Sequence, residues 1–305
     1  MSKPPERAAE GREQPAAYLY MLSSSLAFAT MGAMSHLAGE RSDWQLVAVA
    51  RTSVAFVLSA LLAVSAGVRP VLFGPGVLWV RSLAGSAGVL CAFYALTHLP
   101  ISTALTLSNT VPLWVTLLAW PTLGQKPSAS VWLAVAVGLA GIVLIQRPDL
   151  TGDRLAALLA LGNAACTAVA MIGLNRLGRL DARAVVTHFS GVSTVATLAF
   201  LLLPGQRIDY GALGGAGTAA LLAGVGIAGT LGQLAMTKAF ALGQPARVSV
   251  VGLMQIVFAL GFDLVIWHRR LDALTVAGIA LVAVPSAWLM LHNPLKKSTP
   301  IHTTA

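Results

Sequence analysis

The sequence has very little charge for its length. Only 10% of its 305 residues are charged, whereas an ordinary soluble domain carries about 25%. Hydrophobic residues make up 56% of the chain, and the mean hydropathy is +0.77. A soluble protein of this size needs more charge to cover its surface, so a soluble enzyme is strongly disfavoured. The composition predicts an all-α integral membrane protein.

Cysteine and clustered charge are also scarce. Cys91 and Cys166 both lie in apolar runs, which predicts packing residues and neither a disulfide nor a metal pair. The net charge is +9, but no basic run exceeds two residues, so we expect loop orientation in a lipid bilayer and no nucleic-acid partner. Walker A, HExxH and partnered GxSxG motifs are missing, so we expect no cofactor, no metal and no enzyme activity.

Apolar runs of membrane-spanning length fill most of the sequence. A span takes about 20 residues, and ten spans leave room only for tails and short connections. The predicted spans are 17–36, 45–66, 75–97, 101–120, 129–146, 154–173, 184–203, 213–236, 247–267 and 272–291. Residues 1–16 and 292–305 are then tails, the first of them disordered. With both tails in the cytoplasm, twelve basic residues face inside and six outside, which predicts a multi-pass protein of the inner (plasma) membrane.

The second half of the chain repeats the first. A shift of 144 residues places 83–88 (Leu-Ala-Gly-Ser-Ala-Gly) on 227–232 (Ile-Ala-Gly-Thr-Leu-Gly). The third and eighth spans are then equivalent, which gives two halves of five helices, 17–146 and 154–291. An odd number of spans per half inserts the halves with opposite orientation, as in transporters with inverted repeats and a midplane substrate site.

Three stretches of the first half resemble a known family. They are 81–85 (Arg-Ser-Leu-Ala-Gly), 93–100 (Phe-Tyr-Ala-Leu-Thr-His-Leu-Pro) and 104–113 (Ala-Leu-Thr-Leu-Ser-Asn-Thr-Val-Pro-Leu). They resemble the EamA-type domain, the repeated unit of the ten-helix drug/metabolite transporter superfamily. The second stretch is similar to the branch that contains S-adenosylmethionine carriers. The chain departs from the family at Gly124-Gln125, where Gly-Glu is usual.

Polar residues inside spans are the candidate substrate-binding residues, because a polar group in hydrocarbon is costly unless it is paired or faces a wet cavity. Pro112, with Asn109 and Thr110 before it, predicts a kinked helix that either lines the substrate path or serves packing. Arg51 lies about two turns into its span. It either attracts an anionic or carboxylate-bearing substrate or snorkels, and we expect Arg81, nearer a cytoplasmic end, to snorkel.

Further candidates lie in the later spans and beside Pro100. Gln233 belongs to a polar stripe of the eighth span, and Asn163 and Thr167 form a polar pair at helical spacing in the sixth. Tyr94 is a wall residue or a packing aromatic. His188 is the one histidine well inside a span, where it either exchanges a proton or makes a structural hydrogen bond.

Acidic residues are nearly missing from the predicted spans. Of eleven, only Asp263 falls within one, near the outer end. A central carboxylate relay for protons is therefore disfavoured, and facilitated diffusion or coupling through His188 both stay open. Zwitterionic, anionic or neutral polar metabolites suit Arg51 and Arg81 better than a cationic drug.

These observations predict a secondary transporter of a small polar metabolite, amino-acid-like or S-adenosylmethionine-like, that works by alternating access. A multidrug or metabolite efflux exporter is the alternative, and the sequence does not indicate the direction. An integral membrane enzyme would need paired catalytic groups, and an inert scaffold has no use for polar midplane residues. A chain with both halves fused is expected to act as a monomer or a homodimer.

Overall fold

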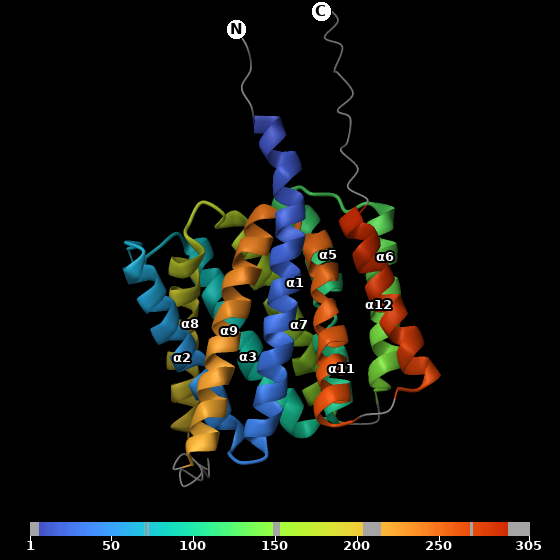
Figure 1. Ribbon diagram of the computed structural model, residues 1–305. Helices are drawn as coiled ribbons and strands as arrows, with labels where there is room; N and C mark the ends of the chain where they lie inside the picture. The colour runs from blue at the N-terminus through green and yellow to red at the C-terminus, as the bar shows by residue number, and fades with distance from the viewer. Residues whose placement is uncertain are drawn as a thin grey trace, which may run out of the picture.

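The computed structural model describes residues 6–69, 71, 73–148, 153–203, 215–268 and 271–291, without the side chains of 6–14, 93, 96, 97 and 101. Every regular element in these ranges is a helix, which agrees with the predicted all-α class (Figure 1). The helices are α1 (Glu6–Gly39), α2 (Trp44–Ser65), α3 (Gly76–His98), α4 (Ile101–Ser108), α5 (Val111–Leu123), α6 (Ala129–Gln146), α7 (Arg154–Arg176), α8 (Ala182–Leu201), α9 (Ala216–Leu242), α10 (Pro245–Gly252), α11 (Met254–Ile266) and α12 (Ala273–Leu291).

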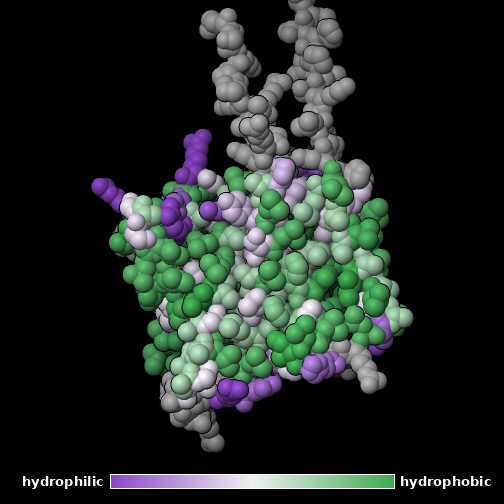
Figure 2. Space-filling model, in the orientation of Figure 1, coloured by the Kyte–Doolittle hydropathy of each residue, from purple (hydrophilic) through white to green (hydrophobic). Residues whose placement is uncertain are grey.

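The chain crosses a membrane several times. Seven helical segments of the described residues are long and apolar enough to span a bilayer. Figure 2 shows a broad hydrophobic belt on the visible face, with hydrophilic residues gathered at its two ends. Large apolar side chains such as Leu61, Leu133 and Val195 are exposed on the described helices. Exposed apolar surface of this extent belongs in lipid.

The helix ends define two faces of the bundle. The start of α1 and the end of α12 lie together at the top of Figure 1, and we call this end the terminal face. The connections after α2, α5, α7 and α9 also lie there. The opposite end, which we call the distal face, carries the turn from α1 to α2 and the ends of α6 and α11.

The first six helices interleave with the last six. The most extensive contacts join α1 to α9, α3 to α7, α2 to α8 and α6 to α12. Glycines permit close approach: a Cβ added at Gly141 of α6 would lie 2.7 Å from the carbonyl oxygen of Gly278 in α12. Helix α8 packs against α2, α3 and α9, and α2 also packs against α9; the candidate site lies among these four helices.

Two segments are broken where single spans are predicted. The fourth span, predicted over 101–120, is α4 and α5 separated at Asn109 and Thr110. Pro112 lies in the first turn of α5, where its missing N–H is tolerated, so the prediction of a kink is replaced by a break. The ninth span breaks in the same way at Leu253, between α10 and α11, without a proline.

The first helix is longer than the sequence predicts. α1 begins at Glu6, well before the expected start at residue 17. The described helix therefore extends into the stretch 1–16 that the sequence predicts as a tail; residues 1–5 and 292–305 lie outside the described residues. Alanine, glutamate, arginine and glutamine dominate this stretch, and their high helix propensity extends the apolar helix.

Candidate functional site

Arg81 is the most deeply buried charged side chain that the structure describes. It lies near the start of α3 and is only 1% exposed. Its Nη2 donates a hydrogen bond to Oε1 of Gln233 in α9 at 3.1 Å. Its Nε and Nη1 have no hydrogen-bond partner among the described residues. Because a guanidinium carries five N–H donors, most of its binding capacity is unused.

Aromatic and glycine neighbours fix the position of this guanidinium. The Cζ of Arg81 lies 3.7 Å from the ring centroid of Phe189 in α8. A Cβ added at Gly85 would lie 2.7 Å from Cε2 of Phe189, and one added at Gly173 would lie 3.1 Å from Cβ of Arg81. The two glycines leave room for the ring and for the arginine stem. The stacked ring holds the guanidinium plane and leaves its edges for hydrogen bonding.

Arg51 of α2 approaches the same face of α9. A Cβ added at Gly229 would meet Cγ of Arg51 at 3.7 Å and Nε at 3.9 Å. Gly229 and Gln233 are four residues apart and therefore lie one turn apart on one face of the helix. The two arginines thus reach neighbouring turns of α9, Arg51 half-buried and Arg81 fully buried.

No acidic side chain among the described residues pairs with either arginine. The ion pairs that the structure records are His36 with Glu40, Arg147 with Asp272, and Arg183 with Asp181, all at helix ends. Asp263 lies in the last turn of α11. The centre therefore carries positive charge without a described countercharge.

A row of hydroxyl and imidazole contacts continues from this centre along α8. Each contact joins a helix of the first half to α8 of the second, and every member is buried. The pairs are Ser82 Oγ with His188 Nδ1 (2.8 Å), Ser86 Oγ with Ser193 Oγ (2.9 Å), and Thr52 Oγ1 with Thr197 Oγ1 (3.0 Å). The edge of Trp79 also packs on the His188 ring, at 4.7 Å between centroids.

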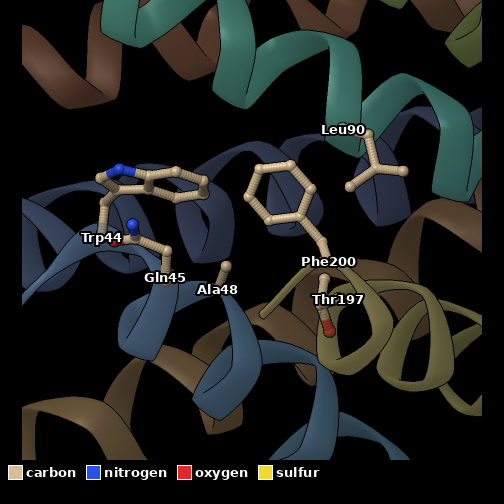
Figure 3. Close-up of a pocket in the computed structure, with 6 residues that line it drawn as sticks. All are labelled: Trp44, Gln45, Ala48, Leu90, Thr197 and Phe200. Carbon is tan, nitrogen blue, oxygen red and sulfur yellow. The ribbon is translucent and has the colours of Figure 1, made fainter. Parts of the chain in front are cut away.

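A small pocket lies beside the far end of this row. It is lined by residues of α2, α3 and α8, namely Trp44, Gln45, Ala48, Leu90, Thr197 and Phe200. In Figure 3 the Phe200 ring lies between Leu90 and Trp44, and Thr197 lies below it. The ring centroids of Trp44 and Phe200 are 5.7 Å apart. These aromatic rings cover the row of polar contacts on the side of the distal face.

The structure brings three of the predicted site residues to this centre. Gln233 bonds Arg81, the side chain of Arg51 from α2 approaches α9 one turn from Gln233, and His188 bonds Ser82, the neighbour of Arg81 in sequence. Their role in binding stays a prediction, because nothing here tests it. They do, however, share one buried region between the halves.

Asn163 and Thr167 lie farther along α7, against α3. Oγ1 of Thr167 donates to Oδ1 of Asn163 at 3.3 Å, so the predicted polar pair forms. A Cβ added at Gly88 would lie 3.2 Å from this Oδ1 and 3.3 Å from this Oγ1. The pair therefore faces α3 in a tight interface, about one turn beyond Gly85.

The remaining predicted residues are not joined to the centre by any recorded contact. Tyr94 stacks on His98, with 4.0 Å between ring centroids. Asn109 and Thr110 bond carbonyls of their own segment, Leu105 and Leu107, and Pro112 is buried in the first turn of α5. The freed hydrogen-bonding groups at the break are thus satisfied locally.

The interpretation of Arg81 as a snorkelling residue is wrong. Its distance from the helix start suggested access to the membrane surface, but α7, α8 and α9 enclose it. The sequence signal that could indicate a buried site at Arg81 is a basic residue inside an apolar helix. Phe189 gives no such signal, because an aromatic residue in an apolar run is ordinary.

Comparison with known proteins supplies the class. Residues 15–147 and 154–291 each match the EamA-like transporter family. The pseudopaline exporter CntI of Pseudomonas aeruginosa is 27% identical over 272 residues, which are 87% of this chain and 93% of the exporter. Solute carrier family 35 member G1 of the mouse is 23% identical over 236 residues, 72% of this chain and 63% of that carrier. A solved crystal structure has a TM-score of 0.78 at 18% identity over 91% of this chain and 97% of its own, which shows the fold.

Several membrane-crossing helices around a buried polar centre define a polytopic membrane protein of the transport class. The chain belongs to the EamA-like transporter family. The resemblance found in residues 81–113 is therefore confirmed. The relatives named here are an exporter and a solute carrier, which supports membrane transport.

Proposed function

We propose that this protein is a secondary exporter that moves a small polar metabolite across the cytoplasmic membrane by alternating access. The observation that carries the proposal is that the buried polar contacts of the centre join the two halves. Arg81 with Gln233, and Ser82 with His188, each pair a residue of the first half with one of the second. Export is favoured because the similarity to the pseudopaline exporter covers nearly the whole of both chains.

Two inverted repeats underlie this mechanism. We take 17–146 and 154–291 as five-helix units, with α4 and α5 as one crossing and α10 and α11 as another, which makes ten crossings. The family matches the chain twice, in two nearly equal segments. The breaks at Asn109 and Leu253 are 144 residues apart (253 minus 109), the same offset that places Gly85 on Gly229. Five crossings per unit reverse the orientation of the second unit.

The packing of the helices supports the same symmetry. If α1 corresponds to α7 and α3 to α9, the contact of α1 with α9 is the counterpart of the contact of α3 with α7. The contacts of α2 with α8 and of α6 with α12 join equivalent helices directly. A pseudo-two-fold axis through the centre accounts for all four. Rocking of one unit against the other would open the centre to each side in turn.

The orientation follows from the basic residues. Those of the terminal face include Arg69, Lys126, Arg176 and Arg179, and we place this face in the cytoplasm under the positive-inside rule. Both tails are then cytoplasmic, in the inner membrane of a bacterium. A tag on the last residue that is labelled from outside intact cells would contradict this placement.

The substrate path extends beyond the centre. We assign Tyr94, Asn163 and Thr167 to the path between α3 and α7, and Asn109, Thr110 and Pro112 to the broken segment beside it. Discontinuous helices expose backbone groups to bound solutes in many transporters. These residues bond locally in the closed arrangement and would face the path when the units separate.

The driving force has two candidates. If export is coupled to protons through His188, a protonophore that collapses the proton gradient should stop export by the wild-type protein. Export by the His188→Gln variant should then no longer respond to the protonophore. Facilitated diffusion predicts export down the concentration gradient that a protonophore leaves unchanged. A cationic drug is the weaker substrate class, because Arg51 and Arg81 would repel it.

A disulfide between the units tests alternating access. The Oγ atoms of Ser86 and Ser193 are 2.9 Å apart, so Ser86→Cys with Ser193→Cys, in a Cys91→Ala, Cys166→Ala background, suits a disulfide. Oxidation should stop the release of metabolites from cells, and reduction should restore it. The matched controls are the two single-cysteine variants under the same oxidant.

The comparison of metabolites in the medium supplies the readout. Cells that express the wild-type chain should release at least one compound that vector-only cells retain. Identical media from the two strains would overturn the transport proposal. Unchanged release by the fully cross-linked variant would overturn the rocking mechanism and leave transport itself standing.

A further inference from the structure

We infer that the substrate is an acid whose oxyanion, a carboxylate or a phosphate, binds between Arg81 and Arg51, beside the neutral side chain of Gln233. The inference rests on the proposed transport function and deepens it. It concerns the chemical class of the substrate and assigns Arg81, Arg51 and Gln233 to its recognition.

The charges at the centre call for an anionic partner. A charged side chain at membrane depth costs about 2.5–3.5 kcal/mol even on insertion scales, and more when it is isolated. Arg81 is fully buried, and no described acidic side chain pairs with it. Its Nε and Nη1 also lack hydrogen-bond partners among the described residues. A centre with two arginines and no described carboxylate is completed by a ligand that brings the negative charge.

The geometry shows how the acid would enter. A carboxylate or phosphate binds a guanidinium through two parallel N–H groups. Both edges of the guanidinium that offer such a pair include Nη2, the nitrogen that donates to Gln233 at 3.1 Å. Nη2 carries two N–H groups, one on each edge, so its hydrogen bond to Gln233 leaves the other edge free for a bidentate acid. The Phe189 ring on the face of the guanidinium leaves the edges as the route of approach.

A neutral amide at position 233 suits a site for an acid. A hydrogen bond to an ionised acceptor is roughly twice as strong as one to a neutral acceptor, so Arg81 would bind a substrate oxyanion more strongly than it binds Gln233. A glutamate at this position would instead neutralise Arg81 permanently and compete with the substrate. Because Gly229 is one turn before Gln233, the bound acid would also lie close to Arg51.

Charge at position 233 gives a matched pair of variants. Gln233→Glu and Gln233→Met have similar size, and only the first adds a negative charge beside Arg81. We expect Gln233→Glu to lower export by roughly tenfold or more, since an internal ion pair takes the place of the substrate. Gln233→Met removes the hydrogen bond to Arg81 without adding a charge, so we expect a clearly smaller loss of export than with Gln233→Glu.

Variants at Arg81 test charge and shape separately. Arg81→Gln removes the charge and should lower export by roughly tenfold or more. Arg81→Lys keeps the charge but loses the bidentate fork and should lie between wild type and Arg81→Gln. Folded protein is measured for each variant by fluorescence size-exclusion chromatography, and export is normalised to it. If Arg81→Gln does not fold, the two Gln233 variants decide the question.

The readout is untargeted mass spectrometry of medium and cell extract. Compounds released only with the wild-type chain should carry an acidic group. A carboxylate gains a methyl group on treatment with acidic methanol, and a phosphate monoester is lost on phosphatase treatment, so the two sources are distinguished. A released compound without an acidic group, or equal export by Gln233→Glu and Gln233→Met, would overturn the inference while transport stands. Absence of any released compound would overturn transport and the inference with it.

Discussion

Charged side chains have different partners at the centre of the bundle and at its two faces. At the faces, described acids and bases pair with each other: Arg147 bonds Asp272, and Arg183 bonds Asp181. At the centre, Arg81 is buried, and a neutral amide is its one hydrogen-bond partner among the described residues. Exposed pairs are solvated and cost little, so they can anchor helix ends. A buried charge without a described acidic partner is costly, and the proposed anionic substrate would account for its retention.

The largest expected effect comes from the removal of the central charge. We predict that Arg81→Met abolishes export and at the same time raises the thermal stability of the folded protein, by about 1 to 4 kcal/mol, as replacement of buried charges by apolar groups often does. Export assays and thermal unfolding in detergent measure the two quantities. The control is Arg147→Met at the distal face, which should leave export near the wild-type value. Equal loss of export in both variants would remove the contrast between centre and faces.

The second prediction concerns the support beneath Arg81. Gly85→Ala places a Cβ 2.7 Å from the Phe189 ring, so the ring must move and the guanidinium with it. We expect a destabilisation of about 1–3 kcal/mol, the usual cost of overpacking, together with reduced export. Gly32→Ala in α1 is the matched control, because nothing lies within 4 Å of an added Cβ there. A Gly85→Ala variant with wild-type stability and export would show that the centre tolerates a shift of the Phe189 ring.

Much of this arrangement follows from the sequence alone, and the exceptions are informative. Apolar runs predict where most helices lie, because the bilayer sets their length. Pro112 predicts a disturbed fourth span, but no residue marks the break at Leu253, which only the repeat indicates. Charged residues before residue 17 predict a disordered tail, whereas their helix propensity suits the start of α1 at Glu6.

The site was harder to predict than the fold. Gln233, Arg51 and His188 were chosen because polar groups in apolar helices are conspicuous, and they do lie in one region. Arg81 was misplaced because position along one helix does not reveal which neighbours cover it. Phe189 and the serine pairs acquire their roles from contacts between halves, which are more than 100 residues apart in sequence.

The third prediction addresses a paired charge at the distal face. Asp272 precedes α12, and hydrogen bonds from Thr275, followed by the contact with Arg147, hold the pKa of its carboxyl well below the ordinary value. A lowered pKa in the folded state contributes stability above the unfolded pKa of about 4, and the contribution is lost as the pH falls below it. The melting temperature of Asp272→Asn should be slightly below that of wild type at pH 7, and the difference should shrink below about pH 4. Export between pH 6 and 8 should not change, and a change there would link this pair to transport.

The smallest effect is expected at the terminal face. Asp181 caps α8 by accepting a hydrogen bond from the backbone N–H of Arg183, and its carboxylate also pairs with the Arg183 guanidinium at 2.8 Å. The bond from Arg183 is the main reason why the pKa of Asp181 is lowered. Asparagine caps a helix as well as aspartate does, whereas alanine costs about 1 kcal/mol. Asp181→Asn therefore isolates the ion pair, which we expect to contribute little to stability because it is exposed to solvent.

Hydrogen exchange in the first turn of α8 measures both variants at Asp181. Asp181→Ala should exchange clearly faster than wild type, and Asp181→Asn only slightly faster. Added salt should reduce the difference between Asp181→Asn and wild type, because it screens an exposed pair. If Asp181→Asn were instead as damaging as Asp181→Ala, the ion pair would matter as much as the cap. An exposed ion pair would then contribute more to stability than its solvation predicts. The proposed contrast between the paired charges at the faces and Arg81 at the centre would no longer hold.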